Sequence, residues 1–226
     1  MREVALDTET TGLDPAGGHR IVEIACVELV NHVPTGREFQ VYLNPERPMS
    51  PEAEDMHGLT DEFLADKSTF PAVVDELLTF LGDDRLVIHN AEFDIGFLNA
   101  ELERVDYPPL SMERAVDTVE LARRKFPGAQ ASLDALCRRF DIDVSARAKH
   151  GALLDAKLLA AVYLELIGGP QPRLALALAS AAARAEAGSQ SARPAPRPAR
   201  PHAPTAEEQV AHEAFLDLLK DPIWRR

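Results

Sequence analysis

The chain has 226 residues, of which 46% are hydrophobic and 27% charged, and it carries a formal net charge of −13. This composition excludes wholesale disorder, and the length suits one sizeable domain with additional sequence. The strong negative charge argues against a protein that binds nucleic acid through its own electrostatics. It still allows a nucleic-acid enzyme whose metal ions or basic partner offset the charge of the phosphates.

The sequence contains no stretch suited to a membrane or to secretion. Its longest run of small apolar residues, Leu174 to Ala183, is too short to span a bilayer. The N-terminus becomes acidic at Glu3, too early for a signal peptide. The two cysteines, Cys26 and Cys137, lie among apolar residues, which favours buried thiols in a reducing compartment. We therefore expect a cytoplasmic protein.

Alternating segments and short apolar runs predict five strands, which are Glu3–Asp7, Ile21–Val30, Phe39–Leu43, Leu86–His89 and Ala115–Asp117. Helical periodicity predicts helices over 70–81, 91–104, 118–126, 132–140 and 151–167. Ser132 is the expected N-cap of the fourth helix. The strands come first and then alternate with helices, so we expect an α/β fold in which helices flank a mixed sheet.

The composition divides the chain into four parts. We expect a single folded domain over 1–169, because Gly168-Gly169-Pro170 is a strong stop signal. A short Ala- and Leu-rich segment covers 170–183. Residues 184–204 are dominated by Ala, Pro and Arg, and they predict an extended basic linker.

The last part, 205–226, predicts an amphipathic helix and a tail. Thr205 to Glu208 form a capping box, and one helical stripe follows, made of Val210, Ala211, Ala214, Phe215, Leu218 and Leu219. This helix either docks on its own domain or binds a groove on a partner. The long linker favours the partner.

Asp7 and Glu9 are two carboxylates at the end of the first predicted strand. Side chains two residues apart share one face of a strand, so these carboxylates point the same way and repel each other. A hard divalent cation between them would offset that repulsion. The alternative is that both are ordinary solvated charges.

Two further acids, Asp94 and Asp155, lie among apolar residues of predicted helices. A buried carboxylate is costly without a partner, so each is a candidate site residue. The alternative for Asp94 is a position stabilised by the helix dipole. Asn90 is the expected cap of the helix that carries Asp94. His150 precedes the helix of Asp155. It is a candidate functional residue only if the acids meet in space.

Together, these segments resemble the three motifs of the DEDD exonuclease superfamily. The motifs are Asp7-Thr8-Glu9-Thr10-Thr11-Gly12, the segment Asn90–Asp94, and His150 followed by Asp155. A histidine in the third motif marks the DEDDh branch. Within that branch the chain is most similar to the epsilon-subunit family, the proofreading exonucleases of bacterial DNA polymerase III, over nearly all of 3–170 and again at the C-terminus.

The resemblance implies a ribonuclease H-like fold with a five-stranded mixed sheet, a flexible C-terminal tail, and a site that holds two divalent ions, Mg²⁺ or Mn²⁺. It implies that Asp7 bridges the ions, that Glu9 and Asp155 complete one ion site, and that Asp94 anchors the other through water. It makes His150 the general base.

The resemblance also suggests residues that contact the DNA end. They are Asp7, Glu9 and Asp155, together with Leu13 as a wedge and Glu52 and His57 as grips on the terminal nucleotide. From the sequence alone, Glu52 is equally an ordinary helix-start residue, and His57 is equally a loop cap before Gly58.

The implied activity is 3′–5′ removal of mispaired nucleotides from single-stranded or frayed DNA ends, with release of nucleoside 5′-monophosphates. The implied partners are the polymerase alpha subunit, through 205–226, and the sliding clamp, through Gln171–Leu176, where Leu176 replaces a frequent aromatic. The theta subunit is a further candidate partner. The alternatives are a free-standing DEDDh nuclease acting on RNA or DNA ends, and a non-catalytic bridge between polymerase and clamp.

Overall fold

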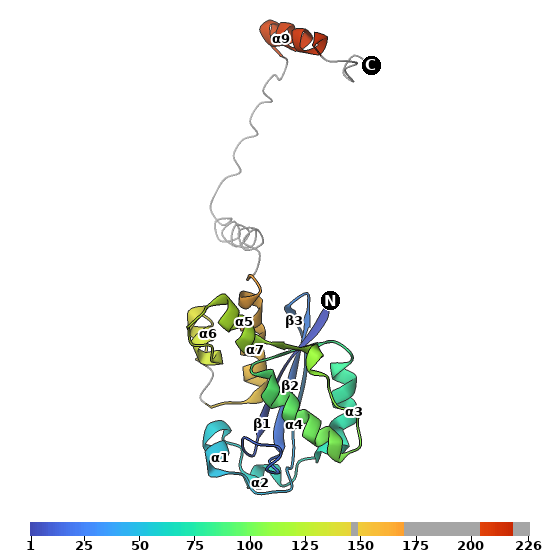
Figure 1. Ribbon diagram of the computed structural model, residues 1–226, viewed down its shortest axis with the longest axis vertical. Helices are drawn as coiled ribbons and strands as arrows, with labels where there is room; N and C mark the ends of the chain where they lie inside the picture. The colour runs from blue at the N-terminus through green and yellow to red at the C-terminus, as the bar shows by residue number, and fades with distance from the viewer. Residues whose placement is uncertain (146–148, 170–203, 219–226) are drawn as a thin grey trace, which may run out of the picture. The chain divides into compact units, whose positions relative to one another are not determined.

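The computed structural model describes residues 1–145, 149–169 and 204–218 (Figure 1). The chain divides into two units, Met1–Leu176 and Ala177–Arg226. The clamp segment at 170–183, nearly all of the linker, and Leu219 with the C-terminal tail lie outside the described residues. Within the described part of the chain, no helix is long and apolar enough to cross a membrane.

The first unit is built on a five-stranded mixed sheet with strand order β3-β2-β1-β4-β5. The strands are β1 (Arg2–Thr10), β2 (Ile21–Val30), β3 (Val33–Tyr42), β4 (Arg85–Ile88) and β5 (Ala115–Asp117). The first three pair antiparallel, and β4 and β5 run parallel to β1. The carboxyl ends of β1, β4 and β5 therefore meet at one edge of the sheet.

Helices cover both faces of this sheet (Figure 1). Helices α3 (Phe70–Leu81) and α4 (Ala91–Arg104) pack on one face, and α5 (Thr118–Lys125), α6 (Leu133–Arg139) and α7 (Ala152–Leu166) pack on the other. The unit also contains α1 (Pro51–His57), α2 (Asp61–Leu64) and a short 3₁₀ turn at Met112–Arg114. The predicted fold class is confirmed: a mixed sheet flanked by helices.

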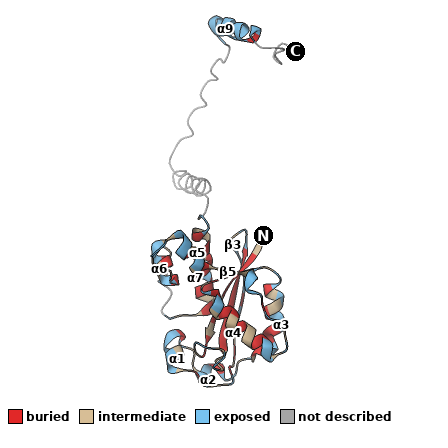
Figure 2. Ribbon diagram, viewed as in Figure 1, coloured by how far each residue is buried: buried red, intermediate tan, exposed pale blue. Residues whose placement is uncertain are grey.

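The alternation of β1 supplies one core on each face of the sheet. Val4 and Leu6 pack with α3 and α4, whereas Ala5 packs with α5, α6 and α7. All three side chains are fully buried, and buried residues line the centre of the unit (Figure 2). The two buried cysteines, Cys26 and Cys137, belong to different cores. Burial on both faces fixes the register of β1, because a one-residue slip would exchange the two cores.

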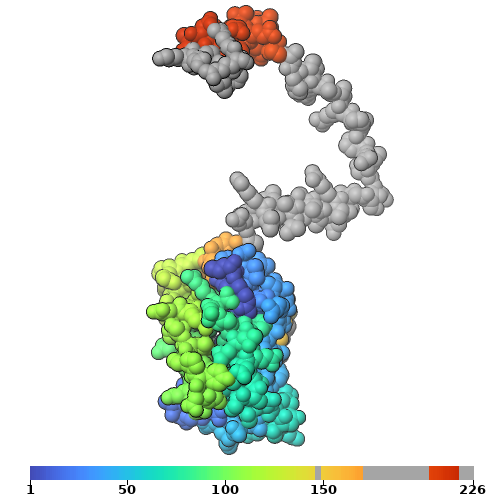
Figure 3. Space-filling model, turned by 90° about the vertical axis from the view of Figure 1, so that its right-hand side faces the viewer, coloured from blue at the N-terminus to red at the C-terminus, as the bar shows by residue number. Residues whose placement is uncertain are grey.

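Helices form much of one face of the first unit. The space-filling view shows one face on which the teal and green residues gather, including α3 and α4 (Figure 3). The predicted helices 70–81 and 91–104 have the bounds that the structure shows. Strand β1 runs three residues further than predicted, to Thr10, because its pairing with β2 continues through a bulge to Ile21. The four-residue helix α2 has no predicted counterpart.

The described part of the second unit, residues 204–218, contains helix α9 (Ala206–Asp217). Its capping box forms as predicted: the Thr205 hydroxyl accepts a hydrogen bond from the Glu208 amide, and the Glu208 carboxylate accepts one from the Thr205 amide. Val210, Phe215 and Leu218 of the predicted stripe are exposed. The apolar stripe is therefore available on the helix surface.

Candidate metal centre

Strand β1 carries two carboxylates to the edge of the sheet. In the pairing with β2, Asp7 lies opposite Ala25 and Glu9 opposite Glu23. Asp7 and Glu9 share the face on which Ala5 packs against α7, since side chains alternate along a strand. Thr8 lies between them and faces α4. The C-terminal end of β1 therefore presents side chains to helices on both faces of the sheet.

Asp94 arrives from α4, which follows β4 to the same edge. It is only 3% exposed, and its Oδ1 accepts a 2.7 Å hydrogen bond from the Thr8 hydroxyl. Asp94 lies in the first turn of α4, where the helix dipole favours a carboxylate, but it is buried rather than solvated.

Asn90 occupies the N-cap position of α4 as predicted, but with a φ of 70° it makes no side-chain cap. The amides of Asn90 and Ala91 instead donate to the Asp117 carboxylate at the end of β5, at 3.3 and 3.2 Å. The left-handed backbone turns the Asn90 side chain out of the capping geometry, so a residue 27 positions away along the chain takes over the cap.

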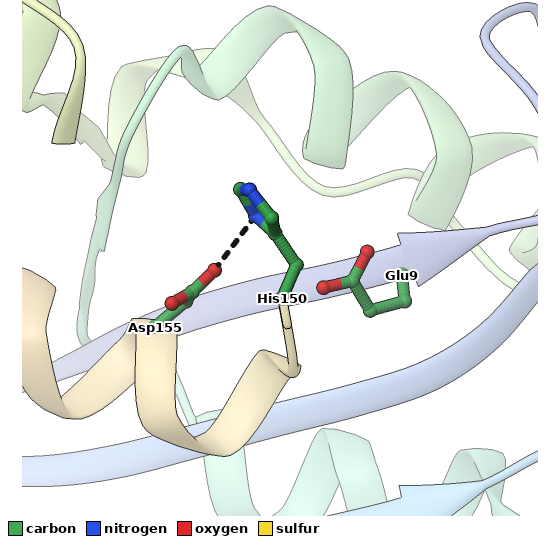
Figure 4. Close-up of side chains that lie close together, drawn as sticks. All are labelled: Glu9, His150 and Asp155. Atoms are coloured by element: carbon green, nitrogen blue, oxygen red, sulfur yellow. Dashed lines mark ion pairs between the residues drawn. The ribbon is translucent and has the colours of Figure 1, made fainter. Parts of the chain in front are cut away.

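Helix α7 carries the fourth acid, and the histidine lies two residues before its start. Asp155, 3% exposed, lies with its Oδ2 3.2 Å from Nδ1 of His150. His150 is partly exposed, and its amide donates to the carbonyl of Met56 in α1. One potential ligand atom from each of Glu9, His150 and Asp155 lies within 4.8 Å of the others (Figure 4). The three motifs therefore meet in space.

The cluster of carboxylates carries an electrostatic cost. Burial raises the pKa of Asp7 well above its usual range, and repulsion from Asp94, Glu9 and Asp155 adds to this. Burial also raises the pKa of Asp94 to about 7, although the Thr8 hydrogen bond opposes that rise. Clustered carboxylate oxygens are the donors that hard divalent cations prefer. The residues present fit a divalent metal site, because a cation would stabilise the ionised forms that burial and repulsion disfavour.

The residues suggested for substrate contact lie in different environments. Leu13, just beyond β1, is 84% exposed, and Glu52 is exposed on the first turn of α1. His57 is buried at the end of α1. Its Nδ1 accepts from the Leu59 amide at 3.0 Å, while Nε2 lies 3.3 Å from the Thr10 carbonyl oxygen. Burial lowers the pKa of His57, so the ring is neutral and both nitrogens are engaged by backbone. The loop-cap interpretation of His57 thus has a structural basis.

Three residues that support the site were not singled out from the sequence. Thr8 and Asp117 hold Asp94 and its helix, and Glu23 contacts the start of α7. Strand alternation could have placed Thr8 and Glu23 on their faces of the sheet. Nothing in the sequence signals their partners.

Comparison with known proteins agrees with this geometry. A family model described as Exonuclease matches residues 4–163. Exonuclease X in complex with 5′-overhanging duplex DNA is 29% identical, with a TM-score of 0.56 over 74% of this chain and 90% of that one. The nuclease domain of 3′hExo, a DEDDh family member, shares the fold at 24% identity and a TM-score of 0.63, over 74% of this chain and 92% of that one. Fold and site thus define the chain as a 3′–5′ exonuclease.

Relatives of similar length show which family of exonucleases the chain belongs to. The DNA polymerase III subunit epsilon of Rickettsia conorii is 49% identical over 97% of this chain and 96% of its own length. The corresponding subunit of Escherichia coli K12 is 44% identical over 99% of this chain and 97% of its own length. The chain belongs to the family of DNA polymerase III epsilon subunits. The resemblance drawn from the three motifs is confirmed.

Proposed function

We propose that this exonuclease removes mispaired 3′-terminal nucleotides from DNA by two-metal-ion hydrolysis and releases nucleoside 5′-monophosphates, as the proofreading subunit of a bacterial replicative polymerase. The observation that carries the proposal is the convergence of four carboxylates, with His150 in contact with Asp155. Two adjacent divalent ions stabilise both the attacking and the leaving oxygen of an in-line phosphoryl displacement.

The proposed ligands are Asp7, Glu9, Asp94 and Asp155, and the proposed ions are Mg²⁺ or Mn²⁺. Asp94, Glu9 and Asp155 all raise the pKa of Asp7, so Asp7 would be the ligand that is shared by both ions. Glu9 and Asp155 complete one ion site. Asp94, held by Thr8 from the α4 side, serves the other.

His150 is the proposed general base. Histidine changes protonation near neutral pH, which suits it to accept a proton from water. Its contact with Asp155 orients the ring, and its partial exposure leaves the ring accessible to solvent. It is placed to act next to the ions without displacing a carboxylate.

Selectivity for mispaired ends follows from fraying. A mispaired terminus unpairs more easily than a paired one, so a site that accepts single strands removes mismatches preferentially. Leu13 is the proposed wedge, because a leucine that is 84% exposed beside the site has apolar surface to place against a base. Glu52 and His57 are proposed contacts to the terminal nucleotide, together with the metal ligands Asp7, Glu9 and Asp155. The small exposed part of the His57 ring limits its contribution.

The proposed organisation assigns catalysis to residues 1–169, clamp binding to Gln171–Leu176, reach to 184–204 and binding of the polymerase alpha subunit to 205–226. The exposed stripe of α9 supports the last assignment, because Val210, Phe215 and Leu218 present apolar surface. Theta is a further proposed partner, and the proposed location is the cytoplasm.

Digestion of a primer–template with a mispaired 3′ end, with and without Mg²⁺, tests the proposed function. We expect metal-dependent release of 5′-mononucleotides, faster than from a paired end, and no release by Asp7→Ala. The polymerase alpha subunit should then co-purify with the full chain. Equal digestion of RNA and DNA ends without polymerase binding would instead support a free-standing nuclease.

A further inference from the structure

Helix α7 begins without a capping side chain of its own. Gly151 occupies its N-cap and forms no side-chain cap, yet the first amides of a helix need acceptors. The amide of Ala152, the first residue of α7, donates to Oε2 of Glu23 at 3.1 Å. The acceptor lies 129 positions earlier in the chain, on strand β2. The hydrogen bond that caps α7 therefore also ties the start of the helix to strand β2.

Both oxygens of the Glu23 carboxylate are used. Oε1 accepts a 2.7 Å hydrogen bond from Gln40 Nε2 on the neighbouring strand β3. The Gln40 amide also contacts the Tyr42 hydroxyl at 3.1 Å. Glu23 itself is only 2% exposed. Hydrogen bonds thus connect Gln40 on β3, through Glu23 on β2, to the first amide of α7. The two bonds together hold the Glu23 carboxylate in one orientation.

A carboxylate at position 23 has an electrostatic cost. Glu23 lies directly opposite Glu9 in the pairing of β2 with β1, and its charge adds to the repulsion on Asp7. A neutral residue there would relieve that repulsion. The favourable interaction of a carboxylate with the positive end of α7 offsets part of the cost.

The position of Ala152 explains what the attachment achieves. It follows His150 by two residues and precedes Asp155 by three. The backbone around it sets the direction of both side chains, whose facing atoms are 3.2 Å apart. Fixing this peptide to β2 therefore fixes His150 and Asp155 relative to Glu9, which β1 carries on the strand next to β2.

We propose that Glu23 is a positioning residue for the exonuclease reaction: by binding the Ala152 amide, it sets the placement of His150 and Asp155 against the carboxylates of β1. The inference rests on the proposed function of the site. Glu23 is proposed neither as a metal ligand nor as a group that contacts DNA. Loss of supporting residues of this kind costs about 10–100-fold in activity or metal affinity.

The test compares Glu23→Ala, Glu23→Gln and Gln40→Ala in the full chain, with Glu28→Ala as the matched control. Glu28 is a second buried glutamate on β2, but its partners are Arg2, Thr35 and Arg37. The readouts are kcat and KM on single-stranded DNA, the number of Mn²⁺ ions bound by calorimetry, and the folded fraction by circular dichroism. Gln40 is exposed, so its replacement leaves the core intact even if Glu23→Ala unfolds.

At equal folded fraction, Glu23→Ala should lower kcat by about 10–100-fold, with KM changed by less than about 3-fold, because DNA contacts remain. Glu23→Gln keeps an oxygen acceptor for the Ala152 amide and should recover most of the rate. Gln40→Ala should lower kcat by about 2–5-fold, as a partial loss of the same support. Glu28→Ala should match the wild-type kcat.

Three results would overturn the assignment. One is a wild-type kcat in both Glu23→Ala and Gln40→Ala. Another is a Glu28→Ala loss as large as that of Glu23→Ala, which would indicate a general effect of destabilising β2. The third is one fewer Mn²⁺ bound by Glu23→Gln, which keeps an oxygen acceptor for the Ala152 amide, so that the loss would make Glu23 a ligand. An inactive wild-type protein would instead refute the proposed function.

Discussion

The Thr8 hydroxyl donates a 2.7 Å hydrogen bond to the Asp94 carboxylate, and this bond joins β1 to α4 across 86 positions of sequence. Asp94 is buried, and burial raises its pKa to about 7 even with this bond in place. The bond orients the carboxylate and stabilises its ionised form, which is the form that a cation binds. Thr8 therefore supports the metal centre from the face of the sheet opposite to Asp7 and Glu9.

Replacing Thr8 with Val keeps the shape of the side chain and removes the donor. We expect the Mn²⁺ concentration for half-maximal activity to rise about 10-fold, since supporting residues typically contribute 10–100-fold to metal affinity. A metal titration of the exonuclease rate measures this. Thr8→Ser, which retains the hydroxyl, is the control. An unchanged titration curve in Thr8→Val would mean that Asp94 needs no orientation by Thr8.

The raised pKa of Asp94 predicts how stability depends on pH in the absence of metal. The folded state holds the Asp94 proton up to about pH 7, whereas the unfolded state releases it near the ordinary value of 3.8. The folded state binds more protons in that interval, so Asp94 lowers the free energy of unfolding as the pH rises from about 4 to 7. The raised pKa of Asp7 acts in the same direction.

Asp94→Asn removes this charge and retains an acceptor for Thr8. In EDTA at pH 8 we expect the variant to be more stable than the wild type, by about 1–3 kcal/mol in urea unfolding. The gain should shrink towards pH 4 and also when Mn²⁺ is added to the wild type, because the ion stabilises the ionised carboxylates. A variant less stable than the wild type at pH 8 would show that burial of the ionised Asp94 carboxylate does not destabilise the fold.

His150→Ala separates a base from a ligand. As a general base, His150 should contribute about 10²–10⁴ to the rate, while Mn²⁺ still binds with the wild-type stoichiometry. The comparison matters because a ring nitrogen of His150 lies within 4.8 Å of carboxylate oxygens of Glu9 and Asp155, so the three residues could together hold an ion. Calorimetry beside the rate measurement checks it. If an ion is lost together with activity, His150 is a ligand.

The exposed stripe of α9 predicts separable functions. Val210→Asp combined with Phe215→Asp places charges on apolar surface that is exposed in the free chain. We expect exonuclease activity on single-stranded DNA to stay at the wild-type level, because the site lies in the other unit. Co-purification of the polymerase alpha subunit should be lost. A pull-down that still captures the polymerase would place the interaction elsewhere.

The sequence predicts this fold well because its local signals are strong. The helices over 70–81 and 91–104 are recognisable from an apolar face and clear ends, and they have the predicted bounds. The ends of strands depend on pairing: β1 continues to Thr10 because Ile21 lies opposite. Asn90 has the residue type of a cap, but a positive φ overrides that preference.

In the candidate site, too, the sequence predicts the local features but not those that depend on tertiary structure. The acids are recognisable from the sequence, because each motif is a short local run of residues. The contacts that hold them depend on tertiary structure: Thr8 with Asp94 and Glu23 with Ala152 are separated by 86 and 129 positions. No pattern in the sequence pairs such residues, so the supporting contacts became visible only once the sheet and helices were in place.

The central claim is that Asp7, Glu9, Asp94 and Asp155 hold two metal ions. Anomalous diffraction from crystals soaked with Mn²⁺ and a nucleoside 5′-monophosphate tests it most directly. We expect two anomalous peaks about 3.5–4 Å apart, with the Asp7 carboxylate between them and Glu9, Asp94 and Asp155 around them. A single peak, or two peaks away from Asp7, would contradict the account.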